Sequence, residues 1–493
     1  MSGTADRAVV IGASIAGLLA ARALTETYAE VILVDRDELP YGPVARVGVP
    51  HARHAHAMLA CGSAVIEELF PGIADQLVAL GAGTGDIQEK TRMYAGPRPM
   101  AAGHVGFTAL AVSRPLLEWT IRQRVAALPG VTFYDRTSVL DLAFSNDLTR
   151  VTGAVVTSLD GAGRKRVLEA DLVVDASGRT ARTPEWLERH GYAPPEEERV
   201  RVDYTTATRR FRRRSLTDTG GALAITHGAG PGLPRGGIVL YQEGDVWTVT
   251  LGGYAGQRPP TELRAFQAYS RTLCAPVIAD IAESLEPLDD GIAYRFPADV
   301  RHRYERMDRF PDGLIVTGDA LCAFDPSLGQ GMSVAAAEAL ALRNELRRGR
   351  KELAKRFFTG AAVHVDTPWT VVVGNGAAAA GIELNDPAPT RLVKRYLTSV
   401  RKAAVDDPVV AGAFLRVAHL IDRPEHLLSL PIAARVGSSA TRRYLVQASA
   451  YGFPDGISVP PRQRPAVGAV KPPGRRGPVG TRQGTPERTG QRS

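Results

Sequence analysis

Cysteine is scarce in this sequence. Only three of its 493 residues are cysteine, Cys61, Cys274 and Cys322, and no two of them have CxxC spacing. An odd number of cysteines at these spacings excludes a small disulfide scaffold, argues against a zinc ribbon and favours a reducing compartment. Hydrophobic residues make up 44% of the chain. That share supports one large domain or two to three ordinary ones.

Lysine is also scarce: it supplies seven of the 60 basic residues behind the net charge of +8. Eight basic residues and a single acid lie between Pro460 and Ser493, so the rest of the chain is close to neutral. The same segment holds seven prolines, six glycines and no aromatic residue. We therefore predict a disordered tail over residues 456–493. Because the tail has no aromatic side chains for base stacking, we expect no nucleic-acid partner.

Long apolar runs are absent. No run approaches the ~18–20 residues that a membrane-spanning helix needs. Residues 8–21 are uncharged and as long as the core of a signal peptide, but Asp6 and Arg7 cancel in charge before them and Gly12 and Gly17 interrupt them. A strand, a turn and a helix explain this segment better. We expect a soluble, cytoplasmic protein without membrane contact.

The N-terminal segment has the pattern of a dinucleotide-binding βαβ unit. Residues 8–11 are a short apolar run that predicts a strand, residues 18–24 predict a helix, and residues 31–34 predict a second strand. The turn between the first strand and the helix has the sequence Gly-Ala-Ser-Ile-Ala-Gly over residues 12–17. The helix N-terminus would face a pyrophosphate, because its free N–H groups and its dipole favour anions.

Each residue of this fingerprint has an expected task. Gly12 allows the tight turn, and Gly17 lets the helix pack closely on the strand. Ser14 stands where a second glycine is usual, but it is small enough for the backbone to approach a phosphate. Asp35 lies 18 residues after Gly17 and is expected to bind a ribose 2′-hydroxyl. An acid there disfavours a 2′-phosphate, so the pattern indicates FAD or NAD rather than NADP.

A second signal lies three hundred residues later. Residues 314–317 predict a strand, and they lead into GDALCAFDPSLGQGM over residues 318–332. A long helix is predicted from about Ser333 to Arg348, so its N-terminus points back at the turn formed by Gly329–Met332.

With these motifs the chain resembles the FAD-dependent monooxygenases of the aromatic-hydroxylase and squalene-epoxidase type. The resemblance covers roughly residues 8–360, and its nearest likeness is to actinobacterial epoxidases that act on polyene precursors of polyethers. It is carried by GVPHARHAH at 48–56, SRPLLEW at 113–119, DLVVDASGR at 171–179 and the segment 318–332. It implies an α/β fold: a Rossmann-like FAD-binding domain of the glutathione-reductase type, an inserted β-sheet substrate domain and C-terminal helices.

The resemblance also implies roles for single residues. Asp319 would accept hydrogen bonds from the ribityl hydroxyls of FAD, and Arg114 would contact the phosphates or the ribityl chain. Gly331 and Met332 would offer N–H groups to the pyrimidine edge of the flavin, where a helix N-terminus stabilises the negative charge of reduced flavin. Pro326 would pack by the flavin face where oxygen reacts. The full implied cofactor-binding set is Gly12, Ser14, Gly17, Asp35, Arg36, Arg53, His54, Arg114, Val139, Asp175, Gly178, Asp319, Pro326, Gly329, Gly331 and Met332.

In that set, Arg36 and the backbone of Val139 would lie by the adenine. Asp175 and Gly178 would lie near the pyrophosphate and the path of a nicotinamide, and Arg53 or His54 near the flavin. The sequence departs from the family pattern at Asp325, where Asn is common, at Ser327-Leu328, where Val-Tyr is usual, and at Thr206, where Tyr is frequent. These changes leave the substrate open.

The function implied is an FAD-dependent monooxygenase that transfers one oxygen atom from O2, through a flavin C4a-hydroperoxide, to a lipophilic alkene or aromatic compound in secondary metabolism. The electrons would come from NADH or NADPH, directly or through a separate flavin reductase. The alternative is an FAD-dependent dehydrogenase or reductase of related fold acting on a prenyl or polyketide-like substrate. The sequence names no catalytic side chain. It predicts no metal site either, because His51, His54, His56 and Cys61 lack a carboxylate or second cysteine to complete a ligand set.

Five segments are predicted: an FAD-binding domain over residues 1–185, with a substrate-side portion at about 76–104; a sheet domain over 186–294; the second part of the FAD-binding domain over 295–360; a helical region over 361–455; and the tail. Within the sheet domain, strands at 238–241 and 246–251 predict a hairpin, and residues 261–285 predict one helix. The arginines between Arg209 and Arg214 indicate either a site for an acidic partner or a solvated strand edge.

Overall fold

The structure is a computed structural model, and it describes residues 6–160, 163–230, 232–382 and 387–450. The chain divides into two compact units, Met1–Arg443 and Tyr444–Ser493. The predicted tail, residues 456–493, lies outside the described residues.

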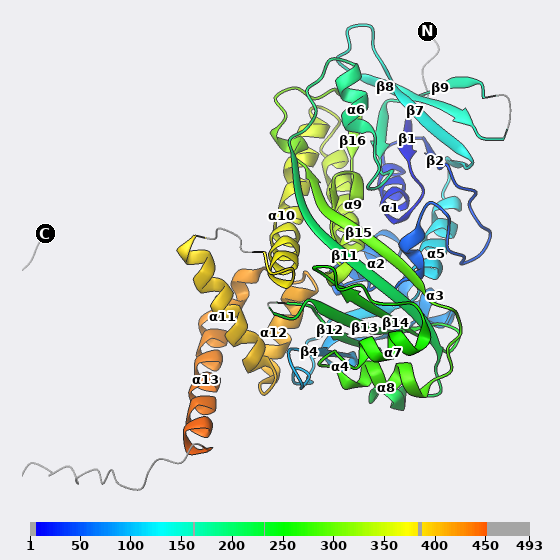
Figure 1. Ribbon diagram of the computed structural model, residues 1–493. Helices are drawn as coiled ribbons and strands as arrows, with labels where there is room; N and C mark the ends of the chain where they lie inside the picture. Colours follow the sequence, from blue (N-terminus) through cyan, green and yellow to red (C-terminus); the bar gives the residue numbers. More distant parts are fainter. Residues whose placement is uncertain (1–5, 161–162, 231, 383–386, 451–493) are drawn as a thin grey trace, which may run out of the picture. The chain divides into compact units, whose positions relative to one another are not determined.

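A five-stranded parallel sheet forms the centre of the first unit (Figure 1). Its strand order is β16 (Leu314–Val316), β10 (Leu172–Asp175), β1 (Arg7–Ile11), β2 (Glu30–Val34) and β6 (Val131–Tyr134). Strands β1, β2, β10 and β16 are short runs rich in Val, Ile and Leu, and nearly all of these side chains are buried, whereas the edge strand β6, with the sequence VTFY, is only partly buried. Continuous apolar runs of this kind are typical of parallel sheets that are covered on both faces.

Helices and a second sheet cover the parallel sheet. Helix α1 (Ile15–Leu24) contacts α9 (Gly331–Arg347) and α5 (Arg114–Ala126), and α9 contacts α2 (Ala60–Leu69) and α10 (Leu353–Ala379). The three-stranded antiparallel sheet of β7 (Thr137–Phe144), β8 (Val151–Ser158) and β9 (Lys165–Glu169) contributes residues to the same core. The remaining elements near this core are α3 (Ile73–Ala79), α6 (Thr183–Arg189), the two-stranded sheet of β3 (Gly83–Asp86) and β5 (Thr108–Ala111), and α4 (Ile87–Lys90).

The second large sheet has seven strands. Its order is β17 (Cys322–Ala323), β15 (Ile292–His302), β11 (Glu197–Arg212), β14 (Val246–Gly253), β13 (Arg235–Gln242), β12 (Ala224–His227) and β4 (Thr91–Tyr94). Strand β4 joins it from the segment predicted to lie on the substrate side. Strand β15 continues to His302, so the sheet extends beyond the predicted boundary at residue 294.

The two faces of this sheet differ because side chains alternate along a strand. On β14, Trp247, Val249 and Leu251 pack into a core with α7 (Leu263–Ser270) and α8 (Pro276–Ser284). The intervening Thr248 and Thr250 are buried on the other face. The second face is therefore buried as well, but it carries hydroxyl groups.

The hairpin prediction is confirmed, because β13 and β14 pair antiparallel from Arg235↔Gly253 to Gln242↔Val246. The prediction of one helix over residues 261–285 is wrong. Two helices, α7 and α8, occupy this region, and Pro276 stands at the first turn of the second one. A proline ring is compatible with the first turn of a helix but clashes with the backbone inside one, so a new helix begins at Pro276.

One interpretation of the arginine cluster is wrong, and the other stays a prediction. Strand β11 lies between β14 and β15, so it is not a sheet edge. Arg209 is buried and donates to the backbone oxygens of Thr261, Asp289 and Asp290. Arg210, which is half-exposed, pairs with the side chain of Asp289. These two arginines hold the loop between α8 and β15, and a contact of the cluster with an acidic partner stays a prediction.

Helices α11 (Ala388–Ala404), α12 (Pro408–Ala418) and α13 (Leu430–Ala450) follow α10. Val400, Val410 and Leu427 are among the residues that form a separate small core there. Over the described part of the chain, no helix combines the length and the apolarity that crossing a bilayer requires.

Replacing Trp247 by alanine tests the core between the sheet and helices α7 and α8. Trp247 is fully buried there. We expect Trp247→Ala to lower the free energy of unfolding by about 3–5 kcal/mol, because the indole leaves a cavity. The control is Val167→Ala on β9, where the side chain is half exposed and the change should stay within about 0.5 kcal/mol. Urea titrations followed by circular dichroism measure both; equal losses would contradict the assignment.

Candidate functional site

The carboxyl ends of the parallel strands bring the predicted residues together. The register aligns Ile11 with Val34 on one side and with Asp175 on the other, and Asp175 with Val316. The segments that follow these strands carry Gly12, Asp35, Gly178 and Asp319. In open α/β sheets this edge is where ligands bind. Four stretches that are far apart in the sequence therefore meet at one place.

The turn after β1 leaves no room for larger residues. Gly12 has φ +101°, and a Cβ at this position would lie 2.5 Å from the Ala176 carbonyl oxygen. A Cβ on Gly17 would lie 1.8 Å from the carbonyl oxygen of Gly12. Both glycines are required by close backbone approach, as the fingerprint predicted.

Asp35 holds this turn in place. Its Oδ2 accepts a hydrogen bond from Ala13 N at 2.7 Å, and its Oδ1 accepts one from Asp37 N at 2.9 Å. The side chain of Arg46 donates to Asp35 at 3.1 Å. The carboxylate thus orients the loop, and its contact with a ribose stays a prediction.

Arg46 and Glu118 form a buried charge network that the sequence interpretation missed. Arg46 Nε donates to Glu118 Oε1 at 2.8 Å, and Ser14 Oγ donates to Glu118 Oε2 at 2.7 Å. Arg114 Nη2 donates to Ser14 Oγ at 2.9 Å. Despite burial, the charges of Arg114 and Arg46 hold the pKa of Glu118 below its usual value. The spacing of Arg114 and Glu118, four residues apart in the motif SRPLLEW, was the available signal, because such residues are neighbours on a helix such as α5.

The loop after β10 is built by Asp175. Its carboxyl is completely buried and accepts hydrogen bonds from Ser177 N, at 2.9 Å, and from the Thr183 hydroxyl. Burial raises its pKa. Gly178 follows with φ +84°. Asp175 is therefore a positioning residue that shapes the turn carrying Gly178.

Glu338 does the same for the loop after β16. It lies on α9, is buried, and accepts hydrogen bonds from Thr317 Oγ1 and Gly318 N, both at 2.7 Å. Burial raises its pKa to about 7. Its contacts fix the strand end directly before Asp319. No sequence motif singled it out, because a helical glutamate is ordinarily solvent-facing.

Asp319 lies on the short helix η4 (Gly318–Ala320), directly after β16. Its side chain is accessible to solvent, yet protein atoms surround it closely enough that burial raises its pKa, against the opposing charges of Arg114 and Arg179. Arg179 in turn lies over the rings of Tyr294 and Phe296, at 5.8 and 4.9 Å. An accessible carboxylate acceptor therefore lies within the electrostatic influence of two guanidinium groups.

Pro326, Gly329, Gly331 and Met332 lie on the adjoining turn. Pro326 begins the short helix η5 (Pro326–Leu328), and Gly329, with φ +64°, ends it. Helix α9 starts at Gly331, and no side chain caps its first turn. Its first N–H groups are therefore available to an acceptor. This arrangement is the one that the resemblance implied for the pyrimidine edge of a flavin.

Residues 51–56, which carry His51, His54 and His56 and are called the histidine loop, connect this region to the seven-stranded sheet. His54 Nδ1 lies 2.7 Å from Thr208 Oγ1, and Thr208 Oγ1 lies 2.6 Å from Thr250 Oγ1. Burial lowers the pKa of His54 to about 4, and that of His56 to about 3. Both rings are therefore neutral at pH 7.

Three other predicted residues lie less centrally. Arg53, on η1 (Pro50–Arg53), and Arg36, directly after Asp35, are exposed. Val139 lies in β7 opposite Val156. The contacts of these residues with a cofactor stay predictions.

The residues present fit FAD. Three buried polar atoms at the site have no hydrogen-bond partner among the described residues, namely Arg114 Nε, His54 Nε2 and Gln330 Oε1. Buried polar atoms are almost always paired, so atoms of this kind indicate a missing polar partner. The glycine turn, the helix starts and Asp319 offer the donors and the acceptor that a pyrophosphate and a ribityl chain need.

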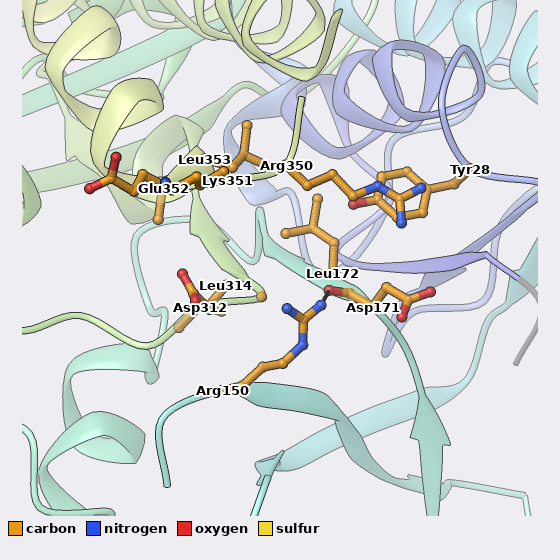
Figure 2. Close-up of a pocket in the computed structure, with 12 residues that line it drawn as sticks. Tyr28, Arg150, Asp171, Leu172, Asp312, Leu314, Arg350, Lys351, Glu352 and Leu353 are labelled. Carbon is orange, nitrogen blue, oxygen red and sulfur yellow. Dashed lines mark hydrogen bonds between the residues drawn. The ribbon is translucent and has the colours of Figure 1, made fainter. Parts of the chain in front are cut away.

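Grouped metal ligands and a separate cavity are the two other features that could indicate a functional site. Within the described residues, no three His, Cys, Asp or Glu side chains are grouped as metal ligands. A cavity of about 400 Å³ lies at the opposite edge of the parallel sheet, where β10 and β16 begin (Figure 2). Its two arginines already have partners: Arg150 donates to Asp171 O, and Arg350 pairs with Asp6 and lies over Tyr28. It holds none of the predicted site residues.

The fold is similar to those of solved structures described as a flavoprotein/dehydrogenase and as monooxygenases. A flavoprotein/dehydrogenase from Cytophaga hutchinsonii superposes with a TM-score of 0.62 at 18% identity, covering 91% of this chain and all of that one. The probable FAD-dependent monooxygenase PqsL from Pseudomonas aeruginosa gives 0.59 at 15% identity, covering 80% of this chain and 100% of that one. For p-nitrophenol 4-monooxygenase PnpA from Pseudomonas putida the values are 0.59 and 17%, covering 85% and 99%.

The sequence places the chain in a family. It is 34% identical to protein Rv3254 of Mycobacterium tuberculosis over 462 residues, which are 89% of this chain and 95% of that protein. The chain belongs to the same family as Rv3254. No protein-family profile matches the chain.

Removing the buried cation tests the charge network. We expect Arg46→Met to lower the free energy of unfolding by about 3–5 kcal/mol at pH 7, because Asp35 and Glu118 would stay buried without their partner. The loss should shrink towards pH 4, where those carboxylates can take up protons. The control is Arg136→Met, which removes a half-exposed ion pair with Asp160 and should cost less than about 1 kcal/mol. Equal, pH-independent losses in the two variants would contradict the assignment.

Proposed function

We propose that this protein is an FAD-dependent monooxygenase. The observation that carries the proposal is the meeting of four segments at the carboxyl edge of the parallel sheet. The glycine turn, Asp319 and the start of α9 follow the ends of these strands or the turn beside them, and Arg114 acts electrostatically on Asp319. These groups match the polar parts of FAD from the pyrophosphate to the pyrimidine ring.

Each group has a binding task. The N-terminus of α1 and Arg114 would hold the pyrophosphate, and Ser14 would keep Arg114 oriented through their 2.9 Å hydrogen bond. Asp319 would accept hydrogen bonds from the ribityl hydroxyls. The uncapped first turn of α9 would donate N–H groups to the flavin pyrimidine edge and stabilise negative charge there. When bound, FAD supplies the electron transfer and the oxygen activation.

The face of the seven-stranded sheet that carries the threonine hydroxyls would help to exclude water from the site. Thr206, Thr208 and Thr250 are buried beside the histidine loop, and each hydroxyl that contacts His54 or its neighbours is already paired. A neutral His54 adds no charge to that wall. Such a surface suits a lipophilic substrate, which would react only after water is displaced.

The substrate that we propose is an alkene or an aromatic compound of secondary metabolism, with O2 as co-substrate. NADH or NADPH would reduce the flavin directly or through a separate flavin reductase. The likeness to a protein described as a flavoprotein/dehydrogenase supports, as a second candidate, oxidation or reduction of a prenyl or polyketide-like compound without oxygen transfer.

Two measurements test the proposal. The purified protein should show flavin absorbance, and Asp319→Ala should weaken FAD binding about tenfold or more, a loss of about 1.4 kcal/mol. Glu169→Ala, an exposed residue of β9, is the matched control and should bind FAD normally.

The second measurement follows oxygen. The reduced protein is mixed with oxygenated buffer, with and without a model polyene or phenol. A monooxygenase consumes one O2 for each product that gains one oxygen atom, and substrate accelerates the decay of the transient spectrum seen during reoxidation. Slow reoxidation without such a transient, together with a product that gains no oxygen, would favour the dehydrogenase or reductase.

A further inference from the structure

Two buried carboxyl groups meet behind the turn that carries Pro326. Asp299 lies on β15, and Asp325 precedes η5; their exposed fractions are 0% and 1%. The backbone N–H of Asp325 donates to Asp299 Oδ1 at 2.6 Å. Asp299 therefore holds the residue directly before Pro326.

The hydrogen bonds of the two side chains are unequal. Asp325 Oδ1 accepts from Ser327 N at 2.8 Å, and Asp325 Oδ2 accepts from the Tyr254 hydroxyl at 2.9 Å. Asp299 Oδ2 is buried and has no partner. Both oxygens of Asp325 are thus occupied as acceptors, while one oxygen of Asp299 is free to carry a proton.

No cation neutralises the pair within the described residues. The segments around it contribute Tyr254, directly after β14, Tyr204 from β11, whose ring lies 4.5 Å from that of Tyr254, and Gly376 from α10. Strand β17 contributes Cys322, a neutral thiol whose pKa is raised by burial. The nearest guanidinium in the strand, Arg301, is paired with Asp366 and Glu305 instead. Two carboxylates in such surroundings cannot both ionise at low cost.

We infer that Asp299 and Asp325 share a single proton at neutral pH, and that this proton keeps the Pro326 turn closed against β15. With one proton, Asp299 can lie beside the Asp325 carboxylate and still accept its backbone N–H. Without it, two like charges would be buried next to each other, and the Asp325–Gly329 segment would be pushed from the sheet. The shared proton itself is independent of the proposed function; only the effect of the turn on a bound flavin rests on it.

The electrostatics agree with this assignment. Burial and the charge of Asp325 together raise the pKa of Asp299 to about 8, although the hydrogen bond from Asp325 N lowers it. Burial also raises the pKa of Asp325, while its hydrogen bonds with Ser327 and Tyr254 lower it. The folded protein therefore binds a proton at Asp299 that the unfolded chain, with an ordinary Asp pKa, releases above about pH 4. Stability must fall as pH rises across that window.

Asp299→Asn tests the shared proton, because an amide keeps the acceptor for Asp325 N and cannot ionise. Relative to wild type, the folding equilibrium constant of this variant should rise by up to about tenfold for each pH unit between about pH 5 and 8, and then level off. Denaturant titrations at several pH values, on the full chain without added flavin, give these constants. Parallel pH profiles of the two proteins would overturn the inference.

Asp325→Asn separates a shared proton from two independent groups. In that background, adding Asp299→Asn should produce a pH-dependent gain that levels off at a lower pH, because the neighbouring charge is gone. An unchanged levelling point would overturn the coupling. Should either variant fail to fold, infrared spectra of the wild type serve instead. Because Glu338 also has a raised pKa, the spectrum is compared with that of whichever variant folds. A carboxylic-acid C=O band that only the wild type shows at pH 7 and loses above about pH 8 supports the inference, and its absence at pH 7 overturns it.

A third arm concerns the turn. FAD release from the wild type should accelerate above about pH 8, and it should be independent of pH in Asp299→Asn. If both proteins release FAD alike while the stability profiles differ as expected, the proton is shared but the turn is not its target. If neither binds FAD, the proposed cofactor is wrong, and the stability comparison still decides the shared proton.

Discussion

The guanidinium of Arg46 lies where the three parts of the nucleotide-binding region meet. It joins Asp35 at the end of β2 to Glu118 on α5, and Asp35 in turn holds the backbone of Ala13 in the glycine turn. Two buried carboxylates would be unstable there without a cation, so this one side chain fixes the spacing of turn, strand and helix. Ser14 and Arg114, the groups nearest to a bound phosphate, take their orientation from the same Glu118.

The rest of the site repeats this principle with other residues. Asp175 shapes the loop after β10, Glu338 shapes the loop after β16, and Asp299 holds the turn before α9. Each is a buried carboxyl that accepts backbone N–H groups at a strand end. The loops that would contact a cofactor are thus held from behind, while Asp319 is left accessible in front of them. Such support is what a binding site needs in order to be preorganised.

Local patterns predicted the parallel sheet, the glycine turn, the β13–β14 hairpin and the long helix α9, because short-range spacing and backbone sterics determine them. The resemblance implied the overall fold, and the structure confirms it. The supporting residues Arg46, Glu118 and Glu338 were missed because most of their partners are far away in the sequence, 72 residues for Arg46 and Glu118 and 20 for Glu338 and Gly318. A charged side chain also gives no sign of burial. For the same reason the sequence did not indicate that Arg209 is buried and closes a loop of the core.

The central claim is that the carboxyl edge of the parallel sheet binds FAD. A crystal structure of the protein grown with FAD tests it directly. The account predicts the pyrophosphate at the N-terminus of α1 beside Arg114, the ribityl chain against Asp319, and the flavin ring at the start of α9. A dinucleotide bound elsewhere, such as in the cavity between Arg150 and Arg350 at the opposite edge of the sheet, would contradict it.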